Sequence, residues 1–125
     1  MSLLTRERSH HPDAIAPDGS EVRILAATAR GSMAQFTLPP GAVSKAVAHR
    51  SVEEVWLCTH GRGRLWRKLH DQEVTAELRP GVSIAIPVGA HFQFRNDGDE
   101  PLHCVGVTMP PWPGMDEAYE VEGAW

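Results

Sequence analysis

From Ser20 onward, apolar and polar residues alternate in short runs that are separated by glycine and proline. The runs are rich in Val, Ile, Thr and aromatic residues, and no stretch sustains the 3.6-residue period of an amphipathic helix. Strands so closely spaced predict an all-β sandwich or barrel. We expect them near residues 22–29, 32–38, 43–49, 54–60, 64–69, 73–78, 82–86, 90–95 and 101–108.

Glycine and proline also mark the joints between these strands. PPG at 39–41 and RPG at 79–81 combine a fixed φ with a permissive glycine, and NDGDE at 96–100 is typical of a hairpin turn. The two halves echo each other, because LPPG precedes a strand that ends at His49 and LRPG precedes one that leads to His91. A duplicated Greek-key unit predicts this pattern, although chance is an alternative source.

The length of the chain sets the number of domains. Its 125 residues, 42% of them hydrophobic, suffice for one compact domain and are too few for two ordinary ones. We place the barrel at residues 20–112. Residues 1–19 lack periodicity and are expected to form a flexible arm, whereas the proline-punctuated residues 113–125 are expected to pack on the barrel as a tail.

Charge and hydropathy exclude several classes of function. Twelve basic and sixteen acidic residues give a formal charge of −4 without a basic block, which argues against a nucleic-acid partner. No apolar run approaches the roughly 20 residues that span a bilayer, and the start is charged where a signal peptide is apolar. We therefore expect a soluble cytoplasmic protein that has no membrane partner. Cys58 and Cys104 lie in apolar runs and are expected to be inert buried thiols.

One stretch carries a spacing of residues that points to a site. In the segment GAVSKAVAHRSVEEVWLCTHG, Gly41, His49, Glu54 and Gly61 fall in register with the motif G-x5-H-x-H-x3,4-E-x6-G. This motif is the first of two that define the cupins, and the chain resembles that family.

The second cupin motif, G-x5-P-x-G-x2-H-x3-N, is matched in GVSIAIPVGAHFQFRN. The matching residues are Gly81, Pro87, Gly89 and Asn96. Together the two motifs cover residues 41–96. The resemblance implies a double-stranded β-helix, or jelly-roll barrel, and it implies a homodimer, because cupin barrels often pair.

The chain departs from the family at two positions where cupins place metal-binding histidines. Val47 stands at the first, and Phe92 stands at the second, with His91 one position early. If a bulge after the PVG turn directs His91 inward, the set His49, Glu54 and His91 would suit a divalent metal such as iron, manganese, zinc or nickel. A one-residue offset in a regular strand would instead turn His91 to the opposite face.

Two other interpretations of His49 and Glu54 need no metal. A buried imidazole beside a carboxylate is a competent general base, and some cupin-like sugar epimerases use such a pair. Alternatively, the two side chains satisfy each other in a degenerate barrel that binds a ligand or binds nothing.

Strand alternation proposes further residues for the pocket wall. Trp56 shares a face with Glu54, while Phe92 and Phe94 share a face with each other. Arg64 and Trp66 alternate along another strand, where they would bind an acidic or aromatic ligand through ionic and cation–π contacts. Core packing for Trp56, and a solvated outer face for Arg64 and Trp66, are the alternatives.

The leading hypothesis is a small cupin that acts on a small molecule inside its barrel, with His49 and Glu54 as catalytic residues. Isomerisation, elimination and oxygenation all remain open, with or without metal assistance. The alternative is a metal-free barrel that binds a small ligand without catalysis. A structural or interaction module, with its interior filled by aromatic residues, is a third possibility.

Overall fold

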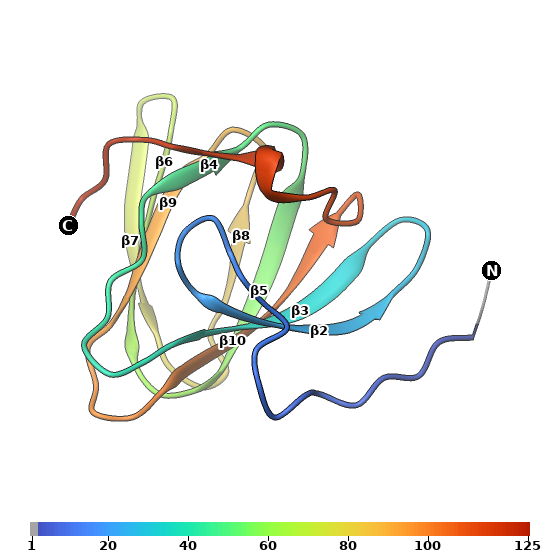
Figure 1. Cartoon of the computed structure of the whole chain (residues 1–125). Coiled ribbons are helices and arrows are strands. Elements are labelled where there is room, and N and C mark those ends of the chain that lie inside the picture. The colour runs from blue at the N-terminus through green and yellow to red at the C-terminus, as the bar shows by residue number, and fades with distance from the viewer. Residues whose placement is uncertain (1–2) are drawn as a thin grey trace.

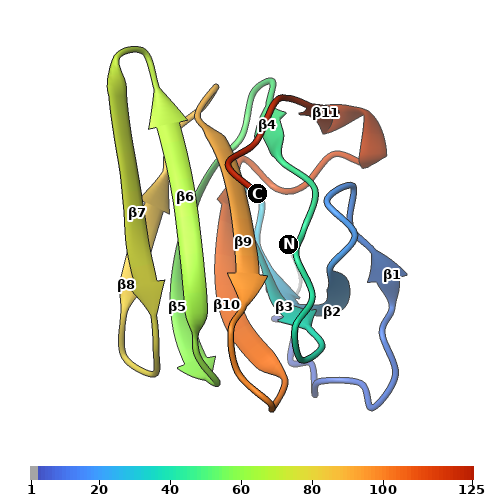
Figure 2. The same cartoon turned by 90° about the vertical axis from the view of Figure 1, so that its left-hand side faces the viewer.

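The computed structural model describes residues 3–125, and it shows two antiparallel β-sheets that face each other (Figure 1 and Figure 2). One sheet has the order β1 (Ala14–Ile15), β2 (Glu21–Ala27), β3 (Ser32–Leu38), β10 (Leu102–Met109), β5 (Glu53–His60) and β8 (Ser83–Ile86). The other has the order β11 (Ala118–Glu120), β4 (Val47–His49), β9 (His91–Asn96), β6 (Gly63–Leu69) and β7 (Gln72–Leu78).

The all-β prediction is confirmed, and the predicted strands match the structure closely except in two places. The strand expected at 43–49 is regular only over Val47–His49, and Val43 forms an isolated bridge to Arg95. The short strands β1 and β11 were not predicted. Between residues 3 and 125 the helical element is one 3-10 turn, η1 (Met115–Glu117). No helix in this range has the length and apolar character needed to cross a membrane.

The core lies between the sheets, because the inward residues of each strand follow the period of two. Along β5, buried and exposed residues alternate, so that Glu54, Trp56 and Cys58 point inward. Cys58 lies directly opposite Cys104 of β10, and both are buried free thiols. The core cluster consists of Leu38, Val47, Trp56, Cys58, Leu65, Leu78, Ile84, Ile86, Ala90, Phe92, Phe94, Leu102 and Cys104.

Part of the arm expected to be flexible packs on the barrel. Ala14 and Ile15 pair with β2, and the backbone N–H of Lys45 donates a hydrogen bond to the carbonyl of Asp18, 2.8 Å away. Arg23 also donates hydrogen bonds to the carbonyls of Ser9 and His10. Backbone pairing therefore holds residues 14–18 on the sheet edge although they lack an alternating pattern. Residues 1 and 2 of the expected arm lie outside the described residues.

The segment 110–125 crosses one end of the barrel beside β4 (Figure 1). Its anchor is the carboxylate of Glu117, which accepts hydrogen bonds from the backbone N–H groups of Ser51 and Val52 at 2.5 and 2.7 Å. The hydroxyl of Ser51 donates a third at 2.8 Å. Burial alone raises the pKa of Glu117, but these hydrogen bonds outweigh it and hold that pKa below its usual value.

The end of the same segment is held on the outer face of the five-stranded sheet. The side-chain oxygen of Gln93 accepts hydrogen bonds from the backbone N–H groups of Ala124 and Trp125, each at 3.0 Å. A Cβ atom at Gly123 would overlap this oxygen, so the close approach requires glycine. The predicted tail thus lies against the barrel at both of its ends.

We expect Glu117→Ala to lower the free energy of unfolding by about 2–3 kcal/mol, because two backbone N–H groups and a hydroxyl lose a charged acceptor. Urea denaturation of both proteins measures this difference. Asp116→Ala is the matched control, because the neighbouring carboxylate makes no such contact, and it should change stability by less than about 0.5 kcal/mol. Equal effects of the two substitutions would contradict the anchoring role.

Candidate functional site

A cavity of about 260 Å³ lies between the two sheets. Phe36 and Trp56 line it from the six-stranded sheet, and Val47 and Phe92 line it from the other. Segments at the two ends of the chain complete the wall: residues 14–18 line one side, and Trp112 and Met115, which follow β10, line another. The lining is mainly apolar and aromatic, so the few polar groups within it stand out.

Glu54 is the central polar group of the cavity. Its side chain is 4% exposed, and its Oε2 accepts a hydrogen bond from the indole N–H of Trp56 at 2.5 Å. The two residues are two positions apart on β5, so they share the inward face. Burial raises the pKa of Glu54 to about 7, and the indole hydrogen bond only partly opposes this shift. The carboxyl group therefore titrates near neutral pH.

His49 lies beside Glu54, at the end of β4. Its Nδ1 is 3.7 Å from Oε1 of Glu54, too far for a hydrogen bond, and this buried nitrogen has no hydrogen-bond partner among the described residues. Burial lowers the pKa of His49 to about 4, although the charge of Glu117 acts in the opposite direction. The imidazole is consequently neutral at pH 7, and its Nδ1 is left without a hydrogen-bond partner among the described residues.

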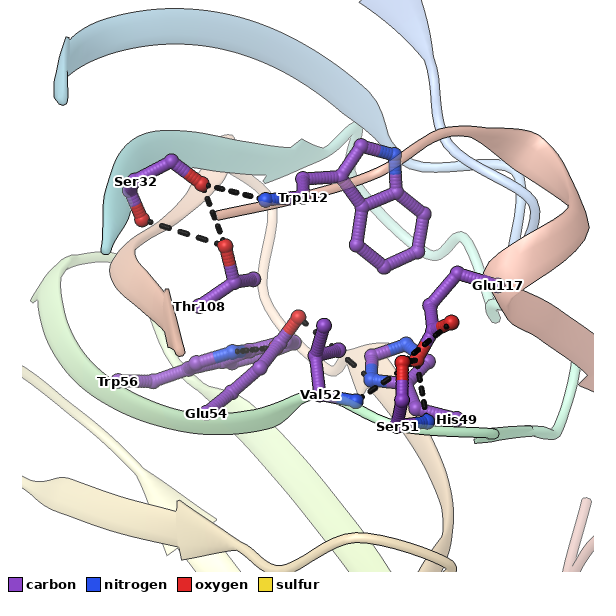
Figure 3. A network of polar contacts seen from close by, with 9 residues as sticks. All are labelled: Ser32, His49, Ser51, Val52, Glu54, Trp56, Thr108, Trp112 and Glu117. Carbon is purple, nitrogen blue, oxygen red and sulfur yellow. Dashed lines mark hydrogen bonds and ion pairs between the residues drawn. The ribbon is translucent and has the colours of Figure 1, made fainter. Parts of the chain in front are cut away.

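Aromatic rings fix the position of the imidazole. The ring of His49 meets the rings of Phe92 and Trp112 edge-on, with both centroid distances at 5.2 Å. Figure 3 shows the indole of Trp112 on the other side of His49 and Glu54 from the strand β5 that carries Glu54. A hydrogen bond from the Trp112 backbone N–H to the Ser32 hydroxyl, at 2.9 Å, holds this segment in place. That hydroxyl also contacts the hydroxyl of Thr108 at 2.5 Å.

Asp18 is a site residue that the sequence pattern did not indicate. Asp18 lines the same cavity and is buried, and its Oδ1 accepts hydrogen bonds from the backbone N–H and the hydroxyl of Ser20 at 2.9 and 2.7 Å. Burial raises its pKa, and its charge contributes to the raised pKa of Glu54. The Asp-Gly pair in PDGS signals a turn, but nothing in the sequence indicates that this turn closes a cavity.

The predicted ligand-binding residues separate into two groups. Trp56 and Phe92 line the cavity, whereas Phe94 is fully buried in the core and packs on Trp56. Arg64 and Trp66 do not line the cavity. The guanidinium of Arg64 pairs with Asp97 at 2.9 Å, and the indole N–H of Trp66 donates to Glu73 at 2.7 Å.

The structure also separates the three predicted metal ligands. Phe92 points into the cavity, so His91, the preceding residue of β9, is directed to the opposite face. In the sheet register His91 lies opposite Lys68 of β6. Among residues 3–125, no group of three or more His, Cys, Asp or Glu side chains is placed to hold a metal ion. Val47 and Phe92 put apolar side chains where cupins place metal-binding histidines. The donor set therefore does not fit the metal that the resemblance implied.

Comparison with known proteins establishes the class of protein that this fold defines. A family model described as "Cupin domain" matches residues 34–108, and the chain belongs to the cupin family. The family assignment from the two sequence motifs is thus confirmed. The chain is 26% identical to the uncharacterized protein MJ1618 of Methanocaldococcus jannaschii over an alignment of 121 residues. This alignment covers 93% of this chain and 94% of that protein.

Solved structures show the same fold in larger proteins. Bacillus subtilis oxalate decarboxylase, an enzyme with Mn(II) centers, matches with a TM-score of 0.74 and 19% identity over 90% of this chain and 30% of its own. The capsular polysaccharide assembling protein CapF of Staphylococcus aureus matches with a TM-score of 0.73 and 17% identity over 95% of this chain and 35% of its own. The chain thus spans about a third of each, and at these identities the likeness concerns the fold alone.

The raised pKa of Glu54 predicts a pH-dependent effect of Glu54→Gln on stability. The protonated carboxyl stabilises the folded state below the usual pKa of 4.5, and this contribution is lost as the pH rises through about 7. A glutamine stays neutral at both ends of this range. Relative to the unsubstituted protein, we expect the variant to gain about 2–3 kcal/mol of unfolding free energy between pH 4.5 and pH 8.

Urea denaturation at the two pH values measures this gain. The lowered pKa of His49 makes the free energy of unfolding change with pH in the opposite direction. His49 is present in both proteins, so this contribution cancels in the comparison. Glu53→Gln alters the exposed neighbour on the same strand and should show no such pH-dependent gain. A difference for Glu54→Gln that stays constant with pH would show that the carboxyl is not desolvated.

Proposed function

We propose that this cupin binds a small, mostly apolar molecule inside its barrel and that His49 and Glu54 exchange a proton with it. The observation that carries the proposal is the unpartnered Nδ1 of His49, which lies 3.7 Å from the Glu54 carboxyl group in an otherwise mainly apolar cavity. A buried polar atom without a partner costs free energy. A ligand that supplies the missing hydrogen bond would remove that cost.

The cavity limits the size and shape of the ligand. Its volume of about 260 Å³ lies just below the roughly 300–1,000 Å³ of pockets for drug-sized molecules. Trp56, Phe92 and Trp112 present aromatic walls, which favour a flat ligand. These features support a compact molecule with a single ring or a short branched chain, and one polar group directed at His49.

The two side chains provide both halves of a proton transfer. A pKa of about 4 leaves the imidazole of His49 unprotonated and able to accept a proton at neutral pH. A pKa of about 7 divides Glu54 between a protonated form that donates and an ionised form that stabilises an imidazolium. Isomerisation and elimination need only such transfers, and neither requires the donors that Val47 and Phe92 replace.

The second candidate function is ligand binding without catalysis. The specific observation in its favour is that His49 and Glu54 do not form a hydrogen bond with each other. A catalytic pair commonly tightens when substrate binds, whereas a binding site uses the two groups separately. A compound that binds in the cavity without being turned over would distinguish binding from catalysis.

The ring opening of 5-nitrobenzisoxazole tests the proton transfer, because a base removes one carbon-bound proton, the nitrogen–oxygen bond breaks and a cyanophenolate forms. We expect the protein to accelerate this elimination with saturation kinetics at pH 7.5, since Nδ1 of His49 accepts the proton. His49→Ala should reduce the rate at saturation by about 100-fold, within the usual range for loss of a general base. Absorbance of the phenolate measures the rate.

Two variants control for the location of the reaction. Ala34→Phe fills the cavity and should abolish saturation, whereas Val55→Phe adds the same ring on the exposed face of β5 and should have no effect. Saturable rates that persist in His49→Ala would contradict the role of His49. Cavity binding of benzyl alcohol, detected by calorimetry, without any acceleration of the elimination would favour the binding function.

A further inference from the structure

Two carboxyl groups from distant parts of the chain share the cavity. Asp18 belongs to the segment that closes the barrel next to β1, and Glu54 belongs to β5. Among the described residues that line the cavity there is no Lys or Arg. The site therefore contains two groups that can carry negative charge and no side chain that is positively charged at neutral pH, because His49 is neutral there.

Each carboxyl group keeps an oxygen for a further partner. The hydrogen bonds of Asp18 within the described residues all involve Oδ1, which binds Ser20. At Glu54 the hydrogen bond from Trp56 involves Oε2, and Oε1 faces His49 at 3.7 Å. Burial raises the pKa of both carboxyl groups, as expected for acids that lack a neighbouring cation.

The walls around these groups suit a positive charge. Trp56 and Trp112 line the cavity together with two phenylalanines. The faces of aromatic rings attract ammonium groups, most strongly where water is excluded. A cation pays a desolvation cost on entering such a cavity, and only a carboxylate close to it offsets that cost. The aromatic walls and the two carboxyl groups thus both favour a positively charged ligand.

We infer that the ligand of this barrel is an organic ammonium ion, a small apolar body with one amino group that Asp18 and Glu54 bind together. The inference rests on the proposed function and adds the chemical class of the ligand. Asp18 and Glu54 both contact the ammonium group, and the unpaired Nδ1 of His49 accepts one of its N–H groups. The same charge arrangement repels carboxylates and phosphates.

Three molecules of matched size test the charge preference. Benzylammonium, benzyl alcohol and benzoate share one ring and differ in the charge of the attached group. In isothermal titration calorimetry at pH 8, we expect benzylammonium to bind with one-to-one stoichiometry and at least about tenfold more tightly than benzyl alcohol, which corresponds to about 1.4 kcal/mol. Benzoate should bind more weakly than benzyl alcohol.

Substitutions then assign the preference to the two carboxyl groups. Asp18→Asn keeps an oxygen that accepts the hydrogen bonds of Ser20, and Glu54→Gln keeps one for Trp56. Each substitution therefore replaces an ionisable carboxyl group by a neutral amide with little change of shape. Each should lower the ratio of benzylammonium to benzyl alcohol affinity by at least about threefold. Glu53→Gln, on the outer face of β5, should leave the ratio unchanged. An unchanged ratio in Asp18→Asn would overturn the role of Asp18.

The outcomes distinguish this inference from the function on which it rests. Benzyl alcohol that binds in the cavity as tightly as benzylammonium would overturn the inference and leave the proposed small-molecule function intact. If none of the three molecules binds, or if Ala34→Phe binds them all unchanged, the cavity is not a ligand site. In that case the proposed function fails, and the inference fails with it.

Discussion

The hydrogen bond from the indole of Trp56 to the carboxyl group of Glu54 is the interaction on which the site depends. Strand alternation places both side chains on the inward face of β5, and the indole N–H is the hydrogen-bond donor that holds the carboxyl group there. Burying an unpaired carboxylate costs several kcal/mol, so the group shifts its pKa toward neutrality instead. The proton transfer proposed for the barrel follows from this buried acid and its neutral neighbour, His49.

The cavity exists because segments outside the two-motif core enclose it. The arm supplies Asp18 and the short strand β1, while the segment after β10 supplies Trp112 and Met115. Glu117 fixes the latter segment through hydrogen bonds to Ser51 and Val52, close to His49 in the chain (Figure 3). Loss of this anchor would therefore affect both stability and the shape of the site.

The sequence predicted the strands in which apolar and polar residues alternate regularly. The alternation predicted the all-β fold. The motif spacing predicted that His49 and Glu54 lie at one site, and in the structure they line one cavity with Trp56 and Phe92.

Other residues could not be placed from the sequence. Arg64 and Trp66 are two positions apart on β6 and share a face, but alternation along a strand does not reveal which face points into the barrel. His91 follows the regular strand register and is directed away from the cavity, so no bulge compensates for its offset. Asp18 and Trp112 were missed because they lie in irregular segments, where tertiary pairing alone decides burial.

Measuring the pKa of Glu54 shows most directly whether the cavity holds a buried acid. Its side-chain carboxyl carbon can be followed by carbon-13 NMR from pH 4 to pH 9, with Glu54→Gln used to assign the resonance. We expect a midpoint of about 7, because the carboxyl group is desolvated and has no paired cation. A midpoint at or below the usual 4.5 would show that water or a positive charge reaches the group, and it would contradict the buried acid on which the proposed function depends.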